Sequence, residues 1–148
     1  MAFVLGIAPL PSVRASEREC TLEAIHQLEN PMDSPRPGSC GELGPYQFRE
    51  RTWRMHTQEP FLKALDRNTS EEVAIRHYEW IKAELSRRGL DPSPYNIALV
   101  WNGGLRAATG SAAPSAARDY ARRAANLSEY FQRAGSGREA HEALADAR

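Results

Sequence analysis

The stretch from Glu29 to Trp53, ENPMDSPRPGSCGELGPYQFRERTW, constrains the chain more than any other part of the sequence. It begins with a carboxylate at the end of an amphipathic segment and crosses a loop rich in Pro and Gly. It then continues through Gly44-Pro45-Tyr46-Gln47, where Gly suits a tight turn and Pro the first position of a helix. The sequence therefore predicts one helix from Ser16 to Glu29 and a second from Pro45 to about Thr57.

Glu29 is predicted to lie on the buried face of the first helix. Ser16 and Glu19 form a capping box, and Leu22, Ile25 and Glu29 follow at i, i+3 and i+7 on one helical face. A carboxyl in that position is partly desolvated and feels the negative end of the helix dipole, and both effects raise its pKa. A general acid near neutral pH needs such a pKa. The alternative is a helix-end Glu that turns out to solvent.

The order of acid, loop, glycine turn and Gln resembles the lysozyme-like superfamily. It is most similar to the lytic transglycosylase (SLT-type) domains and secondarily to goose-type and invertebrate-type lysozymes. The transglycosylase pattern has a catalytic Glu, a loop, a G-A-x-G-L-M-Q turn into a helix, and a Thr soon after. Here the segment 41–47 fills that frame, and Thr52-Trp53 follows it. The sequence of the segment 44–47, Gly-Pro-Tyr-Gln, is more similar to that of invertebrate-type lysozymes.

The resemblance covers about residues 16–131 and implies a mainly α-helical, lysozyme-like domain with a catalytic cleft. It implies that Glu29 is the catalytic acid and that Gln47 lines the cleft beside it. A sugar cleft needs amide and phenol groups for hydroxyls and an aromatic wall for the pyranose face. We expect Gln47, Tyr46 and Phe48 to supply these groups, and we interpret Trp53 as a core residue.

A second motif follows a buried helix. Ser93-Pro94 predicts the start of this helix, since Ser caps helices and Pro suits their first position. The helix is almost wholly apolar and ends in Asn102-Gly103-Gly104, which resembles the A-A-Y-N-A-G motif of the SLT family. A buried helix that ends in one amide and a glycine turn can fix a substrate-facing polar group. The alternative for Asn102 is a helix-end residue without a ligand.

Between these motifs the sequence predicts structural elements. Residues 61–65 indicate a short helix or turn, and Thr69 with Glu72 forms a second capping box that opens a helix to about Arg88. His77 on this helix is interpreted as incidental. The expected core face of the helix consists of Ala74, Tyr78, Ile81 and Leu85.

The last part of the chain is predicted to be a loop, a helix and a tail. Residues 105–115 are rich in Gly, Ala, Ser and Pro and indicate a loop that borders the cleft. The helix covers about 115–133 and carries Tyr120, which matches the Tyr of the family's E-T-x-x-Y motif and is expected to bind substrate. Ala116 and Ala117 stand where that motif has Glu and Thr. We expect the domain to end at residue 134, with a flexible charged tail over 135–148.

The number of carboxylates in the cleft separates two kinds of glycan cleavage. A hydrolase needs a second carboxylate, and invertebrate-type lysozymes place an Asp later in the loop. Asp33 comes too soon after Glu29 to match it, and we interpret Glu42 as a solvated loop side chain. SLT-type enzymes need one acid, because the substrate supplies the attacking hydroxyl. The sequence therefore favours a transglycosylase.

Composition limits the partners of the chain. Its 148 residues are enough for one domain with a single core. Lys+Arg and Asp+Glu both number 19, so no net charge draws the protein to nucleic acid or to an anionic membrane. Its four His are scattered, and we expect no metal and no cofactor.

The N-terminus and the cysteines bear on export. Residues 1–15 are apolar, but they are too short and too broken by Pro9 and Pro11 to span a bilayer. They indicate a signal peptide or an apolar arm that packs on the domain. Cys20 and Cys40 flank Glu29, so a disulfide in an exported protein would brace the loop after the acid. Two buried thiols are the alternative.

These observations predict an exported, periplasmic or extracellular enzyme that cleaves peptidoglycan glycan strands. The expected reaction breaks the MurNAc–GlcNAc β-1,4 bond with one Glu as acid and base and gives 1,6-anhydro products. One alternative is a hydrolytic lysozyme. The other is a non-catalytic glycan-binding helical module, which Ala116 favours.

Overall fold

Helices make up most of the structure, a computed structural model that describes residues 15–110 and 113–146, with side chains as far as Gly135. In those ranges the regular elements are helices and an isolated β-bridge, and no strand is present. The predicted mainly α fold class is therefore confirmed. The expected signal peptide or arm at 1–15 lies almost wholly outside the described residues. The helices are α1 (Glu17–Glu29), α2 (Glu50–Arg54), the 3-10 helix η1 (Phe61–Leu65), α3 (Arg67–Arg87), α4 (Pro94–Gly103), α5 (Leu105–Thr109) and α6 (Ser115–Asp146).

Local capping signals set several helix starts. The capping box at Ser16 is present in both directions, with Glu19 N donating to Ser16 Oγ at 3.2 Å and Ser16 N donating to Glu19 Oε2 at 2.6 Å. Ser93 caps α4 with Pro94 in the first turn, as the sequence predicts. The start predicted for α3 is wrong, because Asp66 caps the helix by accepting from Thr69 N at 2.8 Å. The helix consequently begins two residues before Thr69.

The segment from Leu43 to Phe48 is a closed turn, and the helix predicted to start at Pro45 is absent. Leu43 and Phe48 exchange two backbone hydrogen bonds of 3.0 Å, and Gln47 N donates to Gly44 O at 3.1 Å. Gln47 takes a left-handed backbone conformation with φ of 46°. Helix α2 begins only at Glu50 and has five residues. Two-stranded pairing across the turn therefore replaces the first turns of the predicted helix.

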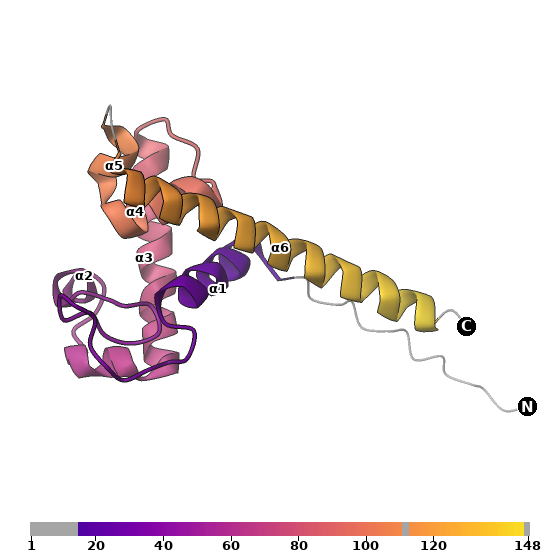
Figure 1. Cartoon of the computed structure of the whole chain (residues 1–148), viewed down its shortest axis with the longest axis horizontal. Helices are drawn as coiled ribbons and strands as arrows, with labels where there is room; N and C mark the ends of the chain where they lie inside the picture. The colour runs from indigo at the N-terminus through magenta and orange to yellow at the C-terminus, as the bar shows by residue number, and fades with distance from the viewer. Residues whose placement is uncertain (1–14, 111–112, 147–148) are drawn as a thin grey trace, which may run out of the picture.

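The C-terminal third also departs from the sequence-based prediction. The expected loop after α4 contains the short helix α5, which follows the C-cap residue Gly104 directly. Helix α6 begins at Ser115 as predicted but continues to Asp146, beyond the expected end near Arg133. In Figure 1 it lies across α4 and α1, both of which it contacts, and α3 crosses behind them.

Two groups of buried residues hold the helices together. The larger group joins α1, the 43–48 turn, α2, α3 and α4, and it includes the predicted core residue Trp53. The smaller group is dominated by alanines of α4, α5 and α6, which let these helices approach closely. None of the described helices is long and apolar enough to cross a membrane. The C-terminal ends of α1 and α4 and the 43–48 turn each contribute residues to the lining of the candidate site.

Candidate active site

Glu29 is the last residue of α1, and its side chain is partly buried. Leu22 and Ile25 on the same helical face are fully buried in the core, so the carboxyl emerges from the apolar stripe as predicted. Burial raises the pKa of Glu29 above its usual range. The negative charge of Glu42 raises this pKa further, whereas a hydrogen bond from Tyr120 lowers it. The net shift is in the direction that a general acid requires.

Tyr120 supports the acid from the last helix. Its hydroxyl donates to Glu29 Oε1 at 2.8 Å, across 91 residues of sequence. Burial, together with the neighbouring Glu29 charge, raises the pKa of Tyr120 well above its ordinary value, so the hydroxyl remains a donor. The sequence placed Tyr120 among the substrate-binding residues. The structure places it on the acid, where it can orient the carboxyl.

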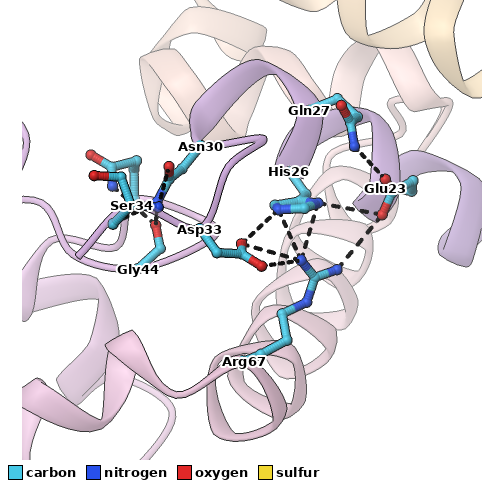
Figure 2. A network of polar contacts seen from close by, with 9 residues as sticks. Glu23, His26, Gln27, Asn30, Asp33, Ser34, Gly44 and Arg67 are labelled. Carbon is cyan, nitrogen blue, oxygen red and sulfur yellow. Dashed lines mark hydrogen bonds and ion pairs between the residues drawn. The ribbon is translucent and has the colours of Figure 1, made fainter. Parts of the chain in front are cut away.

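Asn30 fixes the loop that follows the acid, as Figure 2 shows. The buried amide nitrogen of Asn30 donates to Ser34 O at 2.9 Å and to Gly44 O at 3.2 Å. Its oxygen accepts from Ser34 N at 2.9 Å. One side chain thus ties the end of α1 to both the start of the loop and the 43–48 turn. Asn30, directly after Glu29, therefore has a structural role in holding the loop and the turn at the end of α1.

A second polar network, formed by His26 of α1 and Arg67 of α3, holds Asp33 and is also drawn in Figure 2. His26 Nε2 lies 2.8 Å from Asp33 Oδ1, and Arg67 NH1 lies 3.3 Å from the same oxygen. The Arg67 guanidinium lies over the ring of Tyr46, 5.9 Å from its centroid. Tyr46 is 2% exposed and is part of the core. The structure thus assigns Asp33 and Tyr46 to the packing of α1 against α3 and does not bring either to the cleft.

A cleft of about 670 Å³ opens beside Glu29. This volume falls within the range of about 300–1,000 Å³ that is usual for ligand sites. Three of the predicted site residues, Gln47, Phe48 and Asn102, line it together with the acid. The Gln47 amide nitrogen donates to Gly44 O at 3.0 Å, and Asn102 is exposed at the end of α4. Phe48 is 2% exposed and forms part of the floor.

Glu42 also lines this cleft, and its interpretation as a solvated loop side chain is wrong. The side chain is only 15% exposed. Its Oε2 accepts from Cys40 N at 2.9 Å, and its Oε1 accepts from Arg49 Nε at 3.1 Å. Backbone N–H donation, chiefly from Cys40, lowers the pKa of Glu42, and Arg49 contributes to the same effect. The cleft therefore holds two carboxyl groups whose environments shift their pKa values in opposite directions.

Gly38 makes the approach of Glu42 and Gln47 possible. A Cβ atom at this position would lie 2.5 Å from Glu42 Oε2 and 2.7 Å from Gln47 Oε1. Both distances are shorter than real Cβ contacts allow. A larger residue at this position would therefore displace these two side-chain oxygens from their present places.

His77 and Trp80 of α3 line the cleft, although the sequence reasoning treated His77 as incidental. His77 is 7% exposed, and His56 Nε2 lies 2.9 Å from its Nδ1. Burial lowers the pKa of His77 to about 3, so the ring is neutral at neutral pH. A signal was available in the sequence, because positions 77, 80 and 84 step by three and four beside the core stripe of α3. It predicts a second, partly buried face.

The two cysteines lie in different environments. Cys20 is buried on α1, whereas Cys40 is exposed in the loop, and the structure does not join them in a disulfide. This loop is held instead by hydrogen bonds of the Asn30 and Glu42 side chains. Among the described residues, no group of three or more His, Cys, Asp or Glu side chains is placed to hold a metal ion.

Comparisons of the chain with family models, curated proteins and solved structures give no match. The resemblance to the lysozyme-like superfamily therefore stays a prediction from the motifs at 29–53 and 95–104. What the geometry adds is independent of it: a partly buried acid, a second carboxylate, two amides and a group of aromatic rings share one cleft.

Proposed function

We propose that this protein cleaves the MurNAc–GlcNAc β-1,4 bond of peptidoglycan, with Glu29 as general acid and base. The observation that carries the proposal is the placement of Glu29, which lines a cleft and whose carboxyl has a raised pKa and accepts a hydrogen bond from Tyr120. Gln47 and Asn102 supply amide groups for sugar hydroxyls and N-acetyl groups in the same cleft. Because peptidoglycan lies outside the cytoplasmic membrane, the proposal includes export of the protein.

In the proposed reaction Glu29 gives its proton to the glycosidic oxygen as the bond to the muramoyl C1 breaks. The ionised Glu29 then takes the proton of the muramoyl C6 hydroxyl, and this oxygen bonds to C1 to give a 1,6-anhydro product. No water is consumed. The tethered hydroxyl has a much higher effective concentration than a loosely held water.

Glu42 has a supporting role in this mechanism. Its carboxylate is ionised and can stabilise the positive charge that develops at C1. Its low pKa makes it a weak base, and both oxygens already accept hydrogen bonds from Cys40 N and Arg49. Activation of water by Glu42 is therefore less favourable than attack by the C6 hydroxyl.

Hydrolysis is a second candidate, and the position of Glu42 is the observation that favours it. Retaining and inverting glycosidases use two carboxyl groups that flank the scissile bond. Glu42 lies in the same cleft as Glu29 and affects its pKa, so a second carboxylate is present where the sequence alone indicated none. In that case Glu42 would activate or replace the attacking water.

Digestion of purified peptidoglycan sacculi, followed by mass spectrometry of the products, tests both candidates. Muropeptides lighter by one water than their hydrolytic counterparts are expected from transglycosylation. Reducing muropeptides as the main product would favour the hydrolase instead. Sacculi left intact by the folded protein would contradict cleavage altogether and favour a glycan-binding module.

The substitution Glu29→Gln tests the role of Glu29 as general acid and base. It keeps the size of the side chain but removes the transferable proton, so turnover should fall by about 10²–10⁴-fold. Glu72→Gln, on the exposed face of α3, is the matched control and should leave the rate unchanged. Near-normal turnover in a folded Glu29→Gln protein would remove Glu29 from the mechanism.

A further inference from the structure

Part of the cleft lining is a continuous set of aromatic rings. His77 and Trp80 of α3 stack with 10° between their planes and 5.6 Å between their centroids. Trp101 of α4 packs edge-on against His77 at 4.8 Å. All three side chains line the same cleft as Glu29, and we call them the aromatic wall. Neither the proposed acid chemistry nor the loop motif uses them.

Contacts with Phe48 and His56 hold the rings of the aromatic wall in place. Phe48 is buried and contacts both His77, at 6.1 Å between centroids, and Trp101, at 5.6 Å. His56 fixes the orientation of the His77 ring through the 2.9 Å hydrogen bond to Nδ1. The two indoles keep part of their surface accessible, whereas His77 and Phe48 are buried. An indole that is already fixed loses little conformational entropy when a ligand packs on it.

The charges around the aromatic wall suit an uncharged ligand. Among the described residues that line the cleft, the charged or titratable side chains besides His77 are Glu29, Glu42 and Arg49. Arg49 and Glu42 form an ion pair of 3.1 Å, and the pKa of Glu29 is raised. The lining therefore carries no net positive charge that would attract an anionic polymer. A chain of pyranose rings, whose faces carry C–H groups and whose edges carry hydroxyls, matches indole faces with amides nearby.

We infer that Trp80 and Trp101 form a binding subsite for a sugar ring of a β-1,4-linked N-acetylhexosamine chain, next to the ring that Glu29 acts on. This inference rests on the proposed function and specifies which side chains determine how the glycan strand is held. Trp80 is the specificity-determining residue, because its partly exposed indole is braced on one face by His77. Trp101 completes the subsite and joins it to Asn102, the next residue on α4.

Calorimetric titration with chitohexaose, the β-1,4-linked hexamer of N-acetylglucosamine, tests the subsite. The parent protein carries Glu29→Gln, so that the ligand is bound without turnover. Adding Trp80→Leu keeps an apolar side chain but removes the aromatic face, and the dissociation constant should rise about tenfold or more. Adding Trp80→Phe retains an aromatic face, and binding should stay within a few-fold of the parent.

Controls separate the subsite from general effects. Tyr130→Ala removes an exposed aromatic side chain on α6 and should not change the affinity. Circular dichroism and thermal unfolding identify any variant that fails to fold, and only folded variants are compared. Equal affinity of the Trp80→Leu protein and its parent would overturn the inference.

The titration measures binding alone, so it tests the subsite whether or not the protein is an enzyme. If the protein with native Glu29 cleaves sacculi, Trp80→Leu in that background should raise KM and largely retain kcat. If it does not cleave them, the proposed function fails, but the titration still decides the subsite. Cleavage with an unchanged KM in the Trp80→Leu protein would remove the subsite and leave the proposed function standing.

Discussion

At Glu29, three effects shift the pKa of the carboxyl, and they act in different directions. Burial and the charge of Glu42 raise the pKa of the carboxyl, while the 2.8 Å hydrogen bond from Tyr120 stabilises the ionised form and lowers it. A general acid must be protonated to act, so its rate falls as pH rises through its pKa. In the proposed reaction, the alkaline limb of the pH–rate profile should therefore report the balance of these three effects.

Tyr120→Phe should shift that alkaline limb to higher pH. The substitution removes the donor to Glu29 Oε1, so the ionised form loses stabilisation and the pKa of Glu29 rises further. The maximal rate should also fall, because the carboxyl loses its orienting contact. The measurement is kcat/KM against pH on soluble peptidoglycan fragments. Tyr130→Phe, at an exposed position on the same helix, is the control. A limb that stays in place or moves to lower pH would contradict this role for Tyr120.

The sequence predicted the partly buried position of Glu29 but not all of its neighbours. Glu29 follows from the helical period, because Leu22 and Ile25 mark the buried face seven and four residues earlier. Its partner Tyr120 lies 91 residues away, and only a resemblance pointed to it. Glu42 and His77 were misjudged, since their burial depends on the loop and on α3 meeting in space. Spacing along one element carries no such information.

Among the elements, the 43–48 turn shows why a local signal can mislead. Gly followed by Pro is compatible with a helix start and also with a tight turn, since Pro suits the second position of a turn. In the structure, backbone pairing of Leu43 with Phe48 stabilises the turn in place of a helix start. Packing of Gly44 against Ala64 of η1 supports the same choice. By contrast, the capping box at Ser16 and the Ser93-Pro94 start of α4 depend only on adjacent residues, and both were predicted correctly.

Gly44→Ala should destabilise the protein strongly, and Gly41→Ala is its matched control. Both glycines have a left-handed backbone, with φ of 81° and 79°. An added Cβ at Gly41 meets no atom within 4 Å, so the cost is the backbone strain of about 1–2 kcal/mol. At Gly44 the Cβ would overlap the carbonyl oxygen of Ala64, so the free energy of unfolding should fall further, by about 4 kcal/mol or more in total. Urea unfolding measures both variants.

Equal losses at the two glycines would mean that the 43–48 turn does not pack on η1 as described. If the turn does pack there, the Gly44→Ala protein should also lose activity among its folded molecules. The reason is that Gly44 O accepts hydrogen bonds from Asn30 and Gln47, which connect α1 to the cleft.

For the molecule as a whole, α6 joins the helix that carries the acid to the helix that carries Asn102. Its side chains Ala117, Ala121 and Ala124 are buried against α4 and α5. Further along, Ser128 Oγ lies 3.1 Å from Thr21 Oγ1 of α1, and both residues are fully buried. Small side chains let α6 approach both partners, which places Tyr120 beside Glu29.

Ala121→Leu tests this connection between packing and the site. Ala121 is fully buried, so the larger side chain must push α6 away from α4, and overpacking of this kind costs about 1–3 kcal/mol of folding stability. Asn126→Leu introduces the same side chain at an exposed position of α6 and should change stability by only about 0.5 kcal/mol. Displacement of α6 also moves Tyr120, the neighbour of Ala121, away from Glu29. The folded Ala121→Leu protein should therefore show the same upward shift of the alkaline limb as Tyr120→Phe. A destabilised protein with an unchanged pH profile would show that the position of Tyr120 does not depend on the packing of α6 against α4.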